Sequence, residues 1–375
     1  MPGRLRALVA LVALAASPAQ AQQAGSLVSA QPMLNAPAGM QAWKITYGTT
    51  DENGRAITAT GIVAAPTGPT ASRIRPVIAW THGAWGIAQR CAPSLNPAIL
   101  TLSPALGEMV ARGYVVVAAD YPGLGSPGQH ALLLGRETAH SVLDAVRAAR
   151  GIPAAGSGHA FAVWGESQGG HAALWTAAEA RRYAPDLSLT ATAAAAPPTD
   201  LAANLRSGSD LNARAMLTTF AVYSWSQRLD APLSTLFTPS IQGVVTRLAQ
   251  NNCIELNGKP RLGTILGVVA VRNALRSKDV GAIRPWSVIA RDNSVDPRAV
   301  PGPLMIAQSD ADKIVAPAVT RDFARRYCRL GRPLRYLRMT GTAHENSARD
   351  SAKTTLDWID ARFAGQRDSD DCRGI

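Results

Sequence analysis

A stretch near the middle of the chain combines the patterns of a strand, a sharp turn and a helix. Phe161 to Trp164 is an apolar run with the length of one buried strand. It is followed at once by Gly165-Glu166-Ser167-Gln168-Gly169, and then by an alanine-rich segment typical of a helix. The glycines fit this pattern, because strand and helix approach within contact distance at such a turn and leave no room for Cβ atoms. Ser167 is therefore expected at the N-terminus of a helix, where backbone N–H groups can receive an oxyanion.

A strand, a turn carrying Ser and a helix form the nucleophile elbow of the α/β-hydrolases. The surrounding pattern agrees, since apolar strands alternate with helices up to about residue 200, as in a doubly wound parallel sheet. We expect strands at 43–47, 59–64, 76–81, 114–119, 190–196, 303–307 and 334–338, and helices at 106–112, 137–150 and 348–363. Residues 22 to about 38 are polar and rich in Gly and Pro, so a loosely held arm is expected there.

The alternation of strands and helices stops after the strand at 190–196. From residue 201 to 285 the pattern is mostly helical, with helices expected at 211–228, 241–249 and 265–276. The predicted architecture is an α/β-hydrolase fold with a mostly parallel central sheet, helices on both faces and an inserted helical cap. The core would comprise residues 22–200 and 286–375, and the cap residues 201–285. The apolar cap segments either line an acyl pocket or pack the interior of the cap itself.

The N-terminus has the composition of a secretory signal peptide. Arg4 and Arg6 precede an apolar run from Ala7 to Ala16, and Ala19-Gln20-Ala21 provides a small-residue cleavage site. Removal of residues 1–21 is therefore expected. The apolar run is too short to span a bilayer, and no later segment reaches the required length. We expect a soluble protein that is secreted or periplasmic.

The formal net charge of +12 does not by itself indicate a nucleic-acid partner. The arginines are single or paired, as in Arg181-Arg182 and Arg325-Arg326, and no basic run is interleaved with aromatic residues. A solvated basic surface that favours anionic envelopes or anionic substrates is expected instead. The cysteines show no spacing typical of zinc, and no metal site is expected. Their even number in an exported protein predicts two disulfides among Cys91, Cys253, Cys328 and Cys372, with three possible pairings.

A serine nucleophile needs a general base and an acid that orients the base. In this fold the three follow the chain order Ser, acid, His. His344 alone fits that order, since His171 lies one helical turn beyond Ser167 and four histidines precede the serine: His82, His130, His140 and His159. The loop after the strand at 303–307 supplies Asp312 as the preferred acid, with Asp310 as the alternative.

The oxyanion requires two N–H donors. One is expected from Gln168, the residue after the nucleophile, and the other from the loop that begins at His82, most simply from Ala84. Trp85 and Gly86 are alternatives for the second donor. Asp120 lies at the end of the neighbouring strand, where it either supports this loop or caps a turn.

Taken together, these motifs resemble the secretory lipase family, the lipase A-like α/β-hydrolases. The resemblance runs from about residue 30 to the C-terminus and is carried by Trp80–Gly83, Cys91–Ser94, Asp120–Gly125, Gly165–His171 and Asp312–Val315. The G-x-S-x-G pattern is common to many hydrolases, whereas the Cys-Ala-Pro-Ser segment is found in far fewer of them. One departure is Ala316, which separates Val315 from Pro317 where the family pattern places Pro directly after Val.

The resemblance implies ester hydrolysis without a cofactor, a helical cap over the site and a triad of Ser167, Asp312 and His344. It also suggests a disulfide between cap and core that uses Cys91. Because Cys253 lies in a break between two expected cap helices, we expect the pair Cys91–Cys253. The second pair is then Cys328–Cys372, which would attach the polar C-terminal tail to the core.

The predicted function is that of an exported serine hydrolase, a lipase or esterase, that cleaves small-molecule or lipid carboxylic esters through an acyl-enzyme. Contact with a lipid surface would be transient, and no nucleic acid or membrane span is expected. An exported serine peptidase on the same fold would share the triad. A non-catalytic binding protein would normally have lost Ser, Asp or His, and this chain retains all three.

Overall fold

The computed structural model describes residues 23–68, 74–254, 260–367 and 370–375, so the expected signal peptide lies outside the described residues. Within these residues one nine-stranded sheet has the order β1-β2-β3-β5-β4-β6-β7-β8-β9. The strands are β1 (Leu27–Pro32), β2 (Met40–Thr50), β3 (Ala56–Pro66), β4 (Arg75–Thr81), β5 (Val115–Ala119), β6 (Ser157–Glu166), β7 (Ser188–Ala195), β8 (Leu304–Ser309) and β9 (Leu334–Met339). The six strands from β5 across to β9 are mutually parallel, whereas β1, β2 and β3 pair antiparallel. The expected mostly parallel sheet is confirmed.

The N-terminal arm is the main error in the predicted fold. Residues 27–32 form the edge strand β1, which pairs with β2 from Leu27 opposite Tyr47 to Pro32 opposite Trp43. Leu27 and Ala30 pack against the hydrophobic core. The strand reads Leu-Val-Ser-Ala-Gln-Pro and has only partly buried and exposed residues, so its composition does not give the continuous apolar run by which the central strands can be predicted.

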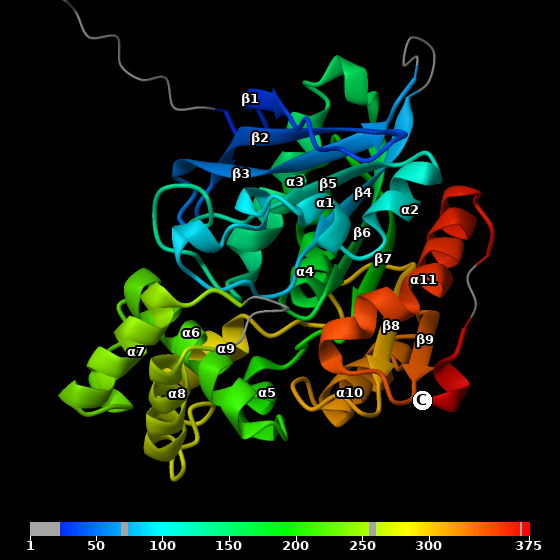
Figure 1. Cartoon of the computed structure of the whole chain (residues 1–375). Coiled ribbons are helices and arrows are strands. Elements are labelled where there is room, and N and C mark those ends of the chain that lie inside the picture. Colours follow the sequence, from blue (N-terminus) through cyan, green and yellow to red (C-terminus); the bar gives the residue numbers. More distant parts are fainter. Residues whose placement is uncertain (1–22, 69–73, 255–259, 368–369) are drawn as a thin grey trace, which may run out of the picture.

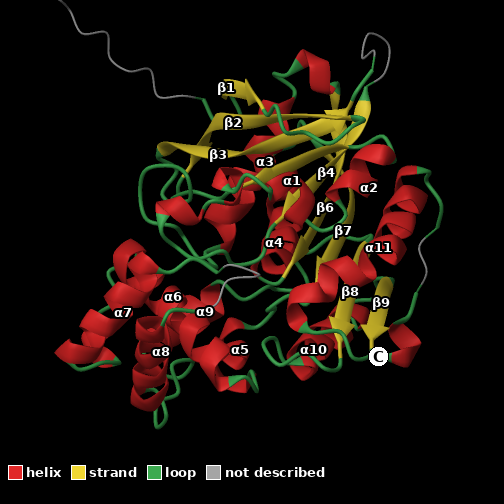
Figure 2. Cartoon of the chain, in the orientation of Figure 1, coloured by secondary structure: helices red, strands yellow, loops and turns green. Residues whose placement is uncertain are grey.

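Helices cover both faces of the sheet (Figures 1 and 2). Successive residues of the central strands point to opposite faces, which divides the core into two layers. Val77 and Val163 pack beneath α3 (Gly135–Ala149) and α4 (Gln168–Tyr183). Ile78 and Trp164 pack beneath α2 (Leu106–Ala111) and α11 (Ser347–Phe363). Burial on both faces explains why these strands are continuous apolar runs in the sequence.

Between β7 and β8 the chain is helical, and this segment lies at the lower left of Figure 1. Two of the helices begin with an Asp side chain that accepts backbone N–H groups, Asp200 before α5 and Asp210 before α6. Their apolar side chains form a separate cluster that includes Phe220, Trp225 and Trp286. None of the helices among the described residues is both long and apolar enough to cross a membrane. The helices are α5 (Leu201–Ser207), α6 (Leu211–Arg228), α7 (Pro239–Asn251), α8 (Leu262–Ala274) and α9 (Trp286–Asp292).

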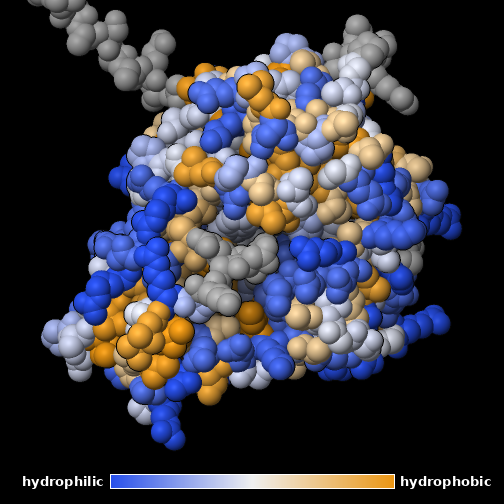
Figure 3. Space-filling model, viewed as in Figure 1, coloured by the Kyte–Doolittle hydropathy of each residue, from blue (hydrophilic) through white to orange (hydrophobic). Residues whose placement is uncertain are grey.

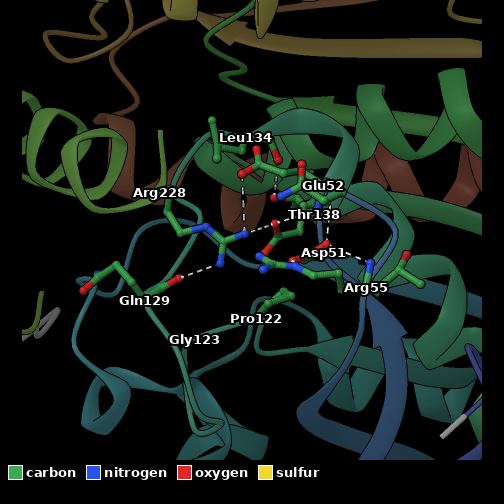
Figure 4. A network of polar contacts seen from close by, with 12 residues as sticks. Asp51, Glu52, Arg55, Pro122, Gly123, Gln129, Leu134, Thr138 and Arg228 are labelled. Carbon is green, nitrogen blue, oxygen red and sulfur yellow. Dashed lines mark hydrogen bonds and ion pairs between the residues drawn. The ribbon is translucent and has the colours of Figure 1, made fainter. Parts of the chain in front are cut away.

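A buried ion pair joins this helical segment to the core (Figure 4). Arg228, the last residue of α6, donates to the Glu137 carboxylate in α3 and lies 3.8 Å from Glu52. The same Glu137 oxygen accepts the backbone N–H of Glu52 at 3.1 Å. Burial raises the pKa of Glu137 to about 7, although Arg228 acts in the opposite direction. Arg228 therefore fixes the end of α6 against both α3 and the β2–β3 turn.

Two disulfides complete the fold, and they follow the expected pairing. Cys91–Cys253 joins the loop after β4 to the chain after α7, and Cys328–Cys372 joins the end of α10 (Pro317–Cys328) to the C-terminal residues. The first disulfide closes 162 residues of sequence, so it holds the helical segment against the core independently of the Arg228 contacts.

Candidate active site

Ser167 lies on a strained turn between β6 and α4. Its φ of 57° and ψ of −122° are rarely adopted by residues other than Gly. The flanking glycines make this turn possible. A Cβ atom on Gly165 would lie 1.9 Å from Thr81 Oγ1, and one on Gly169 would lie 1.9 Å from the Thr81 carbonyl oxygen. The expected absence of room for Cβ atoms at the elbow is confirmed, and the end of β4 is the element that occupies the space.

The structure brings Ser167, His344 and Asp312 together, although 177 residues separate the serine from the histidine. His344 follows β9, and its Nε2 lies 2.7 Å from Ser167 Oγ. Its Nδ1 lies 2.8 Å from Asp312 Oδ2. Both Asp312 and His344 are buried, at 6% and 8% exposure, so this hydrogen-bonded series is largely shielded from water.

Asp312 is held by its own turn, whereas Asp310 is engaged elsewhere. Asp312 Oδ1 accepts the N–H groups of Ile314 and Val315, both at 2.9 Å, which leaves Oδ2 for His344. Asp310 instead forms ion pairs with two arginines, Arg321 and Arg338. Ala316, the additional residue relative to the family pattern, lies after this turn as the N-cap of α10 and leaves the position of Asp312 undisturbed.

The loop after β4 packs directly on the elbow. A Cβ atom on Gly83 would lie 3.7 Å from Ser167 Cβ. His82 Nε2 lies 3.2 Å from the backbone oxygen of Asp120. Burial lowers the pKa of His82. The Asp120 carboxylate accepts the N–H of Ser94 at 2.8 Å and the hydroxyl of Thr60 at 2.6 Å. Asp120 thus supports the loop through its backbone and caps the Cys91–Ser94 segment through its side chain.

Gln168 is the first residue of α4, so its N–H has no acceptor within the helix. Its side chain is oriented by a buried histidine, with 3.1 Å between Gln168 Nε2 and His130 Nε2. His130 Nδ1 lies 3.0 Å from the carbonyl oxygen of Pro122. Burial lowers the pKa of His130 to about 3, which keeps the ring neutral. Donation from Nδ1 to Pro122 then leaves Nε2 as the acceptor for the Gln168 amide. His130 precedes Ser167 and so is excluded as the base by chain order, but no pattern in the sequence predicts its contact with Gln168.

Glu166, directly before Ser167, is a second carboxyl group at the site, and no pattern in the sequence predicts its role. Its Oε1 accepts the N–H of Ala348 at 2.7 Å, in the first turn of the helix that follows His344. Burial raises the pKa of Glu166 to about 7, against the opposing effects of the Ala348 hydrogen bond, His344 and Arg349. Glu166 therefore links the elbow to the segment that carries the histidine.

Because folding raises the pKa of Glu166 from 4.5 to about 7, the folded state binds this proton more tightly than the unfolded chain. The resulting stabilisation is fully present below pH 4.5 and is lost as the pH rises through about 7. Glu166→Gln imitates the protonated carboxyl. We expect its unfolding free energy, relative to that of the natural protein, to increase between pH 4.5 and 8 by up to about 3 kcal/mol. Urea unfolding across this range measures the difference, with Asp230→Asn, at an exposed carboxyl, as a surface control. A difference that does not vary with pH would contradict the raised pKa.

An apolar cavity of about 90 Å³ opens beside the two expected oxyanion donors, Ala84 and Gln168. The helical segment contributes much of its lining, including Leu205 and Leu217, while other apolar residues of the same helices pack among themselves. Several side chains, such as Leu205 and Trp225, belong both to the cavity lining and to this apolar cluster. Among the described residues no group of three or more His, Cys, Asp and Glu side chains is arranged to hold a metal ion.

Comparison with known protein families gives one match that covers most of the chain. Residues 99–223 and 270–371 match the family described as secretory lipase. A lipase A from Moesziomyces aphidis is 26% identical over 161 residues, which is 40% of this chain and 33% of that lipase. The aligned region thus spans about a third of the length of this relative.

Solved structures of similar fold cover nearly the whole chain. Lipase A from Candida antarctica in its closed state has a TM-score of 0.75 at 18% identity, and the match covers 93% of this chain and 84% of that chain. A ligand-bound form of the rice cell wall degrading esterase LipA from Xanthomonas oryzae has a TM-score of 0.70 at 20% identity, covering 92% of this chain and 100% of that chain. At these identities the likeness establishes the α/β-hydrolase fold.

Proposed function

Because the chain belongs to the secretory lipase family, we propose that it is an exported carboxylic ester hydrolase whose triad is Ser167, Asp312 and His344. The observation that carries this proposal is the continuous series from Ser167 Oγ through His344 Nε2 and Nδ1 to Asp312 Oδ2, with separations of 2.7 and 2.8 Å. These separations lie within the range in which a base accepts the proton of a nucleophile.

In the proposed mechanism Ser167 Oγ attacks the ester carbonyl carbon while His344 Nε2 takes the hydroxyl proton. The N–H groups of Gln168 and Ala84 donate to the oxyanion of the tetrahedral intermediate. The alcohol leaves with the proton from His344, and water then hydrolyses the acyl-enzyme by the same steps in reverse order. Asp312 accepts the Nδ1 hydrogen throughout, so it holds the imidazole in the tautomer that leaves Nε2 free to act as a base.

Export is proposed on two grounds. The N-terminal residues have the charge and hydrophobicity pattern of a signal peptide, with cleavage expected after Ala21. All the cysteines are paired in disulfides, which persist in secreted and periplasmic proteins and are rare in the cytosol. We assign residues 201–285 to a cap, and we propose that the ester's acyl chain enters the apolar cavity that this cap shares with the core.

Apolar side chains on α8 favour activity at a lipid surface in addition to activity on dissolved esters. Leu262 and Leu266 are 71% and 61% exposed, and Ile265 beside them is 45% exposed. Figure 3 shows apolar residues gathered over α7 and α8. Exposed apolar groups of this kind mark surfaces that contact lipid or another protein. Arg261 adjoins them and would complement an anionic lipid surface.

The function is tested with p-nitrophenyl esters from acetate to palmitate, beside p-nitroanilide peptides as substrates of the alternative peptidase. We expect turnover of the esters at rates that depend on acyl length, and no turnover of the peptides. The double variant Leu262→Ser/Leu266→Ser should lower activity on an emulsified triglyceride several-fold and leave p-nitrophenyl acetate hydrolysis unchanged. Cleavage of the peptides in preference to the esters would contradict the proposal.

A further inference from the structure

A second cavity, of about 420 Å³, lies between α5, α6 and α8. Its lining is strongly basic, because the side chains of Arg214, Arg272, Arg276 and Lys278 all border it. No Asp or Glu among the described residues lines the same space. A concave site surrounded by charges of one sign concentrates ions of the opposite sign.

This basic cavity borders the apolar cavity of the candidate active site. Three residues, Leu205, Arg214 and Thr218, line both spaces. The apolar cavity extends from Gln168 and Ala84 to these residues, and the basic cavity continues beyond them. An acyl chain attached to Ser167 Oγ and lying in the apolar cavity would therefore reach the basic cavity at Arg214.

The charges of the basic cavity are not neutralised by the protein in its described part. Arg214 Nη1 donates to the backbone oxygens of Arg206 and Gly208, at 2.6 and 3.2 Å. Arg272 Nη1 donates to the neutral Asn212 Oδ1 at 3.0 Å, and Lys278 Nζ donates to a backbone oxygen. These contacts hold the side chains in place but leave their charge uncompensated.

The acidic residue that follows Lys278 in the sequence is engaged outside the cavity. Asp279, which follows Lys278, pairs with Arg206 at 3.2 Å and does not line the cavity. The contrast with Arg112 elsewhere is clear, because that side chain contacts three carboxylates. The cavity thus presents guanidinium groups, which bind carboxylate and phosphate through paired N–H donors, without a carboxylate partner for them among the described residues.

We propose that this cavity binds an anionic group, a carboxylate or a phosphate, at the far end of the substrate chain that occupies the apolar cavity. The inference rests on the proposed ester hydrolysis and specifies its substrate class: esters whose acyl chain ends in an anion. Arg214 is the main specificity-determining residue, because it borders both cavities and is held by two backbone oxygens. A neutral chain of the same length would end against unneutralised guanidinium groups and gain nothing from them.

The test compares p-nitrophenyl monoesters of dicarboxylic acids, from succinate to sebacate, with the same compounds capped as methyl esters. Phosphono-terminated chains of equal length distinguish phosphate from carboxylate. We expect kcat/KM to favour the anionic series by at least tenfold at the chain length that spans the apolar cavity, and this preference to weaken with salt. Arg214→Gln should reduce the preference, measured as the ratio of kcat/KM for the anionic esters to that for the capped esters, by about tenfold.

Arg276→Gln provides a second variant, because this exposed side chain forms no hydrogen bond or ion pair with the described residues. It should reduce the preference about threefold. Arg247→Gln removes one charge from α7, outside the basic cavity, and should leave the preference unchanged.

Equal kcat/KM for anionic and capped esters at every length would overturn the inference while the proposed function stood. An equal loss of preference in Arg247→Gln would also overturn it, because the overall charge and not the cavity would then be responsible. Failure to hydrolyse any ester would refute the proposed function itself.

Discussion

Ser167→Ala is expected to lower kcat for a soluble ester by about 10⁴- to 10⁶-fold while the protein remains folded. Only the hydroxyl is removed, and its hydrogen-bond partner among the described residues is His344 Nε2. The backbone strain at the turn is unaffected by the change, because Ala has the same Cβ as Ser. Initial rates with p-nitrophenyl butyrate measure the effect, and thermal unfolding checks that the variant is folded.

Ser240→Ala, an exposed serine in α7, is the matched control and should retain full activity. Activity of Ser167→Ala within tenfold of the natural protein would mean that another group is the nucleophile. The residual rate of the variant, measured against the spontaneous hydrolysis of the ester, reports what the oxyanion donors and substrate binding contribute without the serine.

Asp312→Asn should lower kcat by about 10⁴-fold, whereas Asp310→Asn should change it by less than about threefold. The amide retains an oxygen that can accept the N–H groups of Ile314 and Val315, so the turn is preserved. Its NH₂ group, however, would donate to His344 Nδ1 and stabilise the tautomer with hydrogen on Nε2, which cannot accept the Ser167 proton. Steady-state kinetics on both variants measure the contrast.

Asp310 serves as the matched control because it lies two residues away and its ion pairs are with Arg321 and Arg338. A large loss in Asp310→Asn together with near-normal activity in Asp312→Asn would reverse the assignment of the acid. The geometry argues against that result, because Arg321 donates to one Asp310 oxygen and Arg338 to the other.

Much of the fold follows from local patterns in the sequence. The strands from β4 to β8 could be predicted because burial on both faces makes them continuous apolar runs, such as Val115–Ala119. The elbow could be predicted because its glycines form a recognisable pattern. Glycine is required at Gly165 and Gly169, since a Cβ atom at either position would clash with Thr81. The edge strand β1 could not, because its fit depends on hydrogen bonds to β2 and not on its own composition.

The residues of the candidate site also include some that could be predicted from the sequence and some that could not. Ser167, Asp312 and His344 could be proposed because their order and their positions after strands are fixed by the topology. The roles of Glu166 and His130 could not, since each depends on a single partner distant in sequence, Ala348 for the first and Gln168 for the second. Arg214 is one of many arginines in the sequence, and only the two adjoining cavities distinguish it.

The central claim, that Ser167 is an activated nucleophile, is tested most directly by covalent labelling. A fluorophosphonate reacts with an activated serine, whose oxygen forms a bond to phosphorus as fluoride leaves. After reaction to complete loss of esterase activity, peptide mass mapping should find one label per chain, on Ser167, and Ser167→Ala should take up none. Complete inactivation with the label on another residue, or full activity with Ser167 labelled, would contradict the account.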